Sequence, residues 1–76
     1  MGGAIPWGNH LIDLLSLAIE LDPDRPYAHE TLGRVYEARG MLGEAEQSFR
    51  EALRKAEQGG FPDLGRFADH LERVRR

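Results

Sequence analysis

Three turn signals divide this chain of 76 residues into four segments, and each segment repeats its apolar side chains at the helical period. The signals are Asp22-Pro23, Gly40 and Gly59-Gly60. Proline lacks the backbone donor that a helix interior uses, and glycine accepts the left-handed conformation that often ends a helix. No segment shows the alternation of period two that predicts a strand. We therefore predict an all-α fold with helices at about residues 9–21, 25–39, 43–58 and 62–75.

The starts of the first two helices are predicted from residues that commonly cap helices. Asn9 is the expected N-cap of the first helix and Asp24 that of the second. Pro26 falls in the first turn of the second helix, where a missing N–H does no harm. Because the connections are short, successive helices should be antiparallel neighbours, stacked as hairpins or in a small bundle.

The predicted helices differ in how widely their apolar residues spread around the axis. The third and fourth are one-sided, with stripes of about 100° and 120°. These two stripes consist of Ala45, Phe49, Ala52, Leu53 and Ala56, and of Leu64, Phe67, Ala68, Leu71 and Val74. The first helix is apolar over about 220°, and only Asp13, Ser16 and Glu20 form a polar wedge. Such a helix needs neighbours on two sides.

The composition excludes several classes of function. The net charge is −3, and acidic and basic residues are interspersed along the chain. The chain therefore lacks the concentrated basic face of a nucleic-acid-binding module. The most apolar run, residues 11–21, is about half as long as a bilayer core, so we expect no membrane span. The chain has no cysteine and no phosphate-binding, nucleophile or HExxH motif. We expect no catalytic residue, cofactor, metal or small-molecule substrate, and the lack of cysteine favours a cytoplasmic protein.

Small and apolar residues recur at fixed offsets in the middle of the chain. The pattern reads His29-x2-Leu32-Gly33-x2-Tyr36, then Gly40, then Ala45-x3-Phe49-x2-Ala52. It resembles the tetratricopeptide repeat, a 34-residue helix–turn–helix unit with the signature W-x2-L-G-x2-Y, A-x3-F and a closing P. Gly33 and Ala45 are small enough to let the two helices of such a hairpin approach closely. Two positions depart from the signature, because His29 stands in place of Trp and Glu57 in place of the proline.

The resemblance covers nearly the whole chain. Residues 18–23 resemble the end of an earlier repeat, with Pro23 placed 34 residues before Glu57. The last helix lacks the Leu-Gly-x2-Tyr pattern and resembles the capping helix of such arrays. The single domain of residues 1–76 thus comprises an N-terminal arm (1–8), a half repeat (9–23), a full repeat (24–59) and a capping helix (60–76).

The resemblance also implies a function. Repeats of this family hold partner peptides in a groove lined by the first helix of each hairpin, so we expect a non-catalytic module whose partner is another protein or peptide. The implied groove residues are Tyr27, Glu30, Thr31, Arg34 and Glu37. Glu30 and Thr31 occupy the main positions of the family's clamp for a peptide carboxylate, and Glu30 would repel that carboxylate. We therefore expect a partner with positive or mixed charge.

The wide apolar surface of the first helix leads to a second expectation, a homodimer that packs first helix against first helix. The expected contact residues are Trp7, Leu11, Ile12, Leu14 and Leu17. Two alternatives for covering this apolar surface of the first helix stay open. Residues 5–7 could fold back onto it, or it could pack on upstream helices of a longer repeat scaffold from which this chain is an excerpt. A purely structural unit that contacts only itself is the alternative function.

Overall fold

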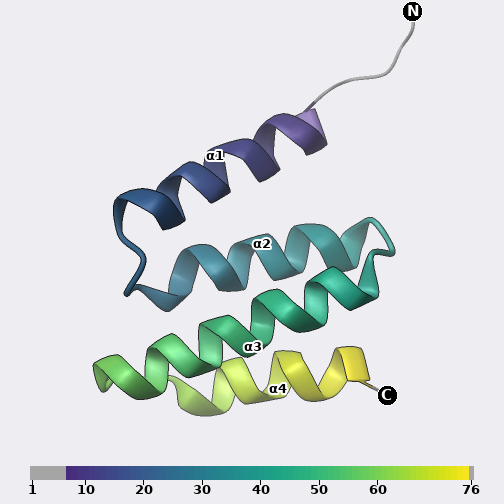
Figure 1. Ribbon diagram of the computed structural model, residues 1–76. Coiled ribbons are helices and arrows are strands. Elements are labelled where there is room, and N and C mark those ends of the chain that lie inside the picture. The colour runs from purple at the N-terminus through teal and green to yellow at the C-terminus, as the bar shows by residue number, and fades with distance from the viewer. Residues whose placement is uncertain (1–6, 76) are drawn as a thin grey trace, which may run out of the picture.

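The computed structural model describes the backbone of residues 7–75 and the side chains of residues 10–75. Within that range the chain forms α1 (Trp7–Leu21), α2 (Pro26–Ala38), α3 (Leu42–Gly59) and α4 (Leu64–Arg75), with no strand. The helices lie side by side in chain order and alternate in direction (Figure 1). This arrangement confirms the predicted all-α stack of antiparallel hairpins. Most of the predicted arm of residues 1–8 lies outside the described residues.

Glycine ends α2 and α3 in the same way. Gly40 and Gly60 have φ of 77° and 69°, in the left-handed region. The N–H of Met41 donates to the carbonyl of Tyr36 at 2.9 Å, and the N–H of Phe61 donates to that of Ala56 at 2.9 Å. These bonds satisfy carbonyls that the helix itself leaves free. Both turn signals were therefore read correctly from the sequence.

The predicted side-chain caps are wrong. Asn9 lies inside α1, which begins at Trp7. The N-cap of α2 is Arg25, not Asp24, and it makes no side-chain capping bond. Its extended backbone, with φ of −89° and ψ of 132°, is the conformation that a following proline imposes. Pro26 itself occupies the first turn as predicted, and this fixed φ begins the helix without a cap.

The core lies between α2, α3 and α4. Its largest fully buried side chains include Phe49 and Phe67, and α3 contributes the small residues that let the neighbouring helices approach. The buried apolar residues are Leu32, Ala45, Phe49, Ala52, Ala56, Phe67 and Leu71. The predicted stripe of α4 is narrower than expected, because Leu64 and Ala68 are exposed.

The main contacts of α1 are with α2, and α1 packs loosely. Ile12, Leu15 and Ile19 are half-buried and share one face of the helix. No residue of α1 with a described side chain is fully buried. No helix in the described part of the chain is long and apolar enough to cross a membrane.

Candidate functional site

Two carboxylates of α2 face the capping helix α4. Glu30 is buried and accepts a hydrogen bond of 3.1 Å from a terminal nitrogen of Arg66, whose Nε lies 2.9 Å from the same carboxylate in an ion pair. Two turns further along α2, Glu37 accepts two bonds from Arg73, at 2.8 Å and 2.6 Å. The forked pair of Arg73 and Glu37 fixes orientation as well as charge. The two ion pairs tie α2 to α4 along the surface that was expected to be an open groove.

His70 joins these two ion pairs. Its Nε2 lies 3.0 Å from Glu30 Oε2, and its Nδ1 lies 3.0 Å from a terminal nitrogen of Arg73. A guanidinium can only donate, so in the neutral ring Nδ1 accepts from Arg73 and the N–H of Nε2 donates to Glu30. The ring also stacks on Phe49, with centroids 4.7 Å apart and planes 7° from parallel. His70 thus connects the polar network to the apolar core.

Electrostatics reinforce the ion pair between Glu37 and Arg73. The hydrogen bond from Arg73 holds the pKa of the Glu37 carboxyl below its ordinary value of 4.5. The same bond raises the pKa of Arg73. Both shifts favour the charged forms, so the pair is fully ionised at neutral pH.

The sequence contains a signal for this network that the repeat pattern does not reveal. Glu30 and Glu37 are seven residues apart, and Arg66 and Arg73 are also seven residues apart. Seven residues make two helical turns, so each pair lies on one face of its helix. Matching spacings of opposite charge on neighbouring helices indicate a contact, although nothing in the sequence alone shows that the helices are adjacent.

The five predicted groove residues therefore divide into two groups. Tyr27 packs against Phe61 and Phe67, with ring centroids 5.6 Å and 5.9 Å away, while Glu30 and Glu37 pair with α4. Thr31 and Arg34 are exposed. The hydroxyl of Thr31 donates to the Tyr27 carbonyl of its own helix at 3.0 Å, and Arg34 makes no ion pair with any residue whose side chain is described. The groove stays a prediction, now reduced to a smaller open surface.

The residues expected to mediate self-association also divide. Leu11, Leu14 and Leu17 are 41%, 50% and 50% exposed, and Leu21 at the end of the helix is 77% exposed. Ile12 belongs to the half-buried face toward α2. The side chain of Trp7 lies outside the described residues. We call Leu11, Leu14, Leu17 and Leu21 the leucine face of α1.

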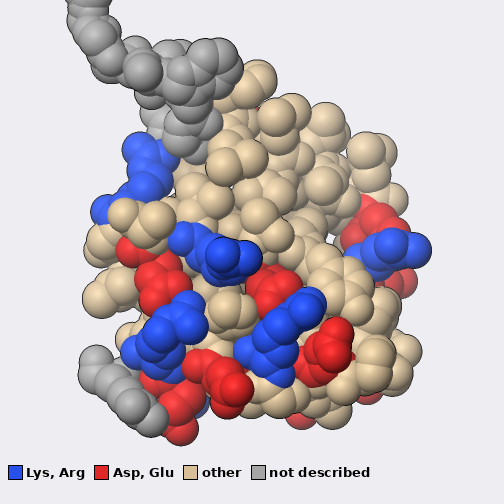
Figure 2. Space-filling model, turned by 180° about the vertical axis from the view of Figure 1, so that it is seen from behind, with Lys and Arg blue, Asp and Glu red and all other residues tan. Residues whose placement is uncertain are grey.

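The charged residues avoid this face. In Figure 2 the red and blue side chains gather over the lower helices, each colour beside the other, while the upper part formed by α1 is largely tan. Within α1 the charged residues are Asp13 and Glu20, with no lysine or arginine. The leucine face is therefore an apolar surface with an acidic border.

Comparison with known families agrees with the fold. Residues 26–58 match the family model of the tetratricopeptide repeat. This segment comprises α2 and most of α3, the hairpin that the sequence pattern predicted. Residues 26–58 therefore form a tetratricopeptide-like repeat. Neither the curated proteins nor the solved structures give a match for the chain. Repeats of this kind typically act as non-catalytic modules for binding other proteins.

Proposed function

We propose that this chain is a non-catalytic protein–protein interaction module that self-associates through the leucine face of α1. The observation that carries the proposal is the exposure of this face in a small domain. Leu14, Leu17 and Leu21 are spaced by three and four residues, which is the spacing by which one helix packs into the side of another. The expected occupant is therefore a helix, and a second copy of α1 supplies one with the same spacing.

The energetics favour a weak dimer. The exposed parts of the leucine face amount to about two whole leucine side chains, worth about 3–6 kcal/mol per copy when buried. Two copies contribute twice that amount, against an association cost of about 4–15 kcal/mol. At the favourable ends of these ranges, about 12 kcal/mol against about 4 kcal/mol, the dissociation constant is about 1 µM. We therefore expect a weak dimer, with a dissociation constant that is micromolar or higher. An antiparallel pair would place Leu14 opposite Leu17 of the other copy and oppose the two helix dipoles.

A matched pair of substitutions tests the proposal. Leu14→Asp puts a charge in the centre of the leucine face, whereas Ser16→Asp adds the same charge to the exposed polar side of the same helix. In light scattering after size exclusion, we expect dimers for the unmodified chain and for Ser16→Asp, and monomers for Leu14→Asp. Because Leu14 is half exposed, circular dichroism should show that the variant keeps its helices. If all three proteins have the same molar mass, the proposal is wrong.

A second binding surface is proposed on α2. Arg34 and Thr31 are exposed between the two ion pairs to α4, so they are available to a partner peptide. In our proposal this surface serves a cytoplasmic protein partner, whereas a purely structural unit would not use it. Arg34→Glu should abolish recovery of such a partner and leave the dimer unchanged. Substituting Glu37 is a poor test, since it also removes the contact with Arg73.

A further inference from the structure

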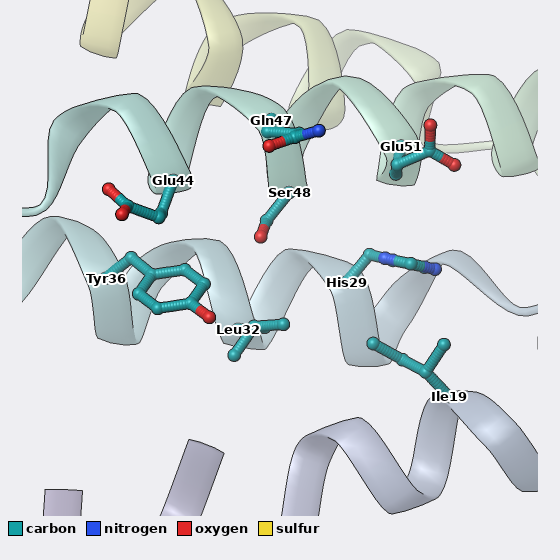
Figure 3. A pocket seen from close by; sticks show the side chains of 8 residues that line it. All are labelled: Ile19, His29, Leu32, Tyr36, Glu44, Gln47, Ser48 and Glu51. Carbon is teal, nitrogen blue, oxygen red and sulfur yellow. The ribbon is translucent and has the colours of Figure 1, made fainter. Parts of the chain in front are cut away.

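A cavity of about 270 Å³ opens between α1, α2 and α3. It is separate from the leucine face, because α1 presents Ile19 to it. In Figure 3, Tyr36 of α2 and Glu44 of α3 lie at one end, and His29 of α2 and Glu51 of α3 lie at the other. The volume suits one amino-acid side chain and is small for a cofactor.

The cavity combines apolar walls with groups that accept hydrogen bonds. Leu32 and Ile19 form the apolar part of the lining. Between the two ends, the hydroxyl of Ser48 points from α3 toward α2 (Figure 3). Ser48 is only 7% exposed, and its side chain makes no hydrogen bond to any described residue. No fully buried side-chain nitrogen or oxygen of the described residues lacks a hydrogen-bond partner, so this hydroxyl is reached from the cavity. It is therefore available to bond a polar occupant.

The two carboxylates of the cavity differ in how far their charge is already balanced. Glu51 accepts a bond of 2.7 Å from Arg54, which lowers the pKa of the Glu51 carboxyl below its ordinary 4.5. Beside it, burial lowers the pKa of His29 below 6.5, so that this ring is mostly neutral at pH 7. Glu44 has no ion pair with any side chain of residues 10–75. The unbalanced negative charge therefore lies at the Glu44 end, beside the ring of Tyr36.

From this arrangement we propose that the cavity receives one arginine side chain of a protein partner, with its guanidinium between Glu44 and Tyr36. A guanidinium has five donors and no acceptor, which complements the carboxylate and the hydroxyls of Tyr36 and Ser48. Its planar cation stacks well on an aromatic ring. The methylene stem would pass along Leu32 and Ile19. The inference rests on the proposed function only in that a protein supplies the arginine.

The test uses N-acetyl-L-arginine amide, titrated into the 15N-labelled chain of 76 residues and followed by NMR. We expect saturable, millimolar binding with shifts at the amides of residues 36, 44, 47 and 48. The neutral isostere N-acetyl-L-citrulline amide should cause no saturable shift at these positions. N-acetyl-L-lysine amide should bind more weakly, because its ammonium cannot fork or stack in the same way.

Two variants and a control locate the site. Glu44→Gln should weaken arginine binding by about two- to fivefold, and Ser48→Ala should weaken it less. Glu57→Gln removes an exposed carboxylate of the same helix outside the cavity and should have no effect. Equal affinity for citrulline, tighter binding of lysine, unchanged affinity in Glu44→Gln, or shifts spread over exposed carboxylates would each overturn the proposal. The oligomeric state of Glu44→Gln should match that of the unmodified chain, so failure here is separable from failure of self-association.

Discussion

Gly33 shows how a single missing side chain sets the distance between α2 and α3. A Cβ at this position would come within 2.7–2.9 Å of three ring carbons of Phe49. Phe49 is fully buried, so its ring cannot move aside without disturbing the core. The glycine of the repeat signature is therefore explained by a steric contact, and its small size predicted the close approach from the sequence.

Gly33→Ala should destabilise the fold. We expect a loss of about 1–2 kcal/mol in the free energy of unfolding, because overpacking outweighs the gain of up to ~1 kcal/mol in helix propensity. Gly43 provides the control, since it is helical and a Cβ there meets nothing within 4 Å. Gly43→Ala should be neutral or stabilising by up to ~1 kcal/mol. Urea unfolding of both variants measures the difference, and equal stabilities would contradict the packing argument.

His29 predicts how stability depends on pH. Burial lowers its pKa below 6.5 and outweighs the opposing effect of Glu51. Between the folded and unfolded values the unfolded chain binds more protons, so the free energy of unfolding falls as the pH falls below 6.5. His29→Gln should reduce this fall, whereas His10→Gln, at an exposed position, should not. Urea unfolding at pH 7.5 and 5.5 tests this, and an unchanged pH dependence in His29→Gln would refute it.

Among the elements, α4 does more than close the core. It supplies Arg66, His70 and Arg73 to the carboxylates of α2. The buried carboxylate of Glu30 is shared by Arg66 and His70, so its coupling to these partners is expected to be stronger than that of an ion pair on the surface. The orientation of α4 thus depends on polar contacts as well as on Phe67 and Leu71.

A double-mutant cycle measures this coupling. For Glu30→Ala and Arg66→Ala we expect a coupling energy of about 1 kcal/mol. For the exposed pair Asp22 and Arg25, whose atoms are 3.1 Å apart, the same cycle should give about 0–0.5 kcal/mol. If the two coupling energies are equal, the polar network between α2 and α4 stabilises the fold no more than an ion pair on the surface does.

The elements also show what could be read from the sequence. Helix ends at Gly40 and Gly60 were predictable because left-handed backbone strongly favours glycine. The caps at Asn9 and Asp24 were wrong because capping residues also occur where no cap is needed, and Pro26 alone suffices to begin α2. The ion pairs between α2 and α4 join residues 36 to 40 positions apart, a separation at which no local pattern carries information.

At the scale of the whole molecule, the chain behaves as a short row of helices. Its radius of gyration is 12.9 Å, whereas a compact domain of this length would have about 11 Å. Its extents are 46 × 32 × 15 Å, and its main contacts join helices that are consecutive in the chain. Stability in such a row is approximately a sum over neighbouring pairs. The weakest pair, α1 with α2, should therefore open first.

Hydrogen exchange tests this order. At low protein concentration, amides of α1 should exchange faster than those of α2 and α3, because α1 has a neighbour on one side only. If the leucine face binds a second copy, protection of α1 should rise with protein concentration while that of α3 stays constant. If the amides of α1 are as well protected as those of α3 at low protein concentration, stability is not a sum over neighbouring pairs of helices.

Self-association through the leucine face is the central claim, and sedimentation equilibrium of the unmodified chain tests it most directly. An antiparallel pair brings Asp13 of one copy near Glu20 of the other, so like charges border the interface and salt should screen their repulsion. We predict a monomer–dimer equilibrium in the micromolar range that tightens between 0.05 M and 0.5 M NaCl. Binding to a basic partner helix would instead weaken with salt. A single monomeric species up to about 500 µM at both salt concentrations would contradict the claim.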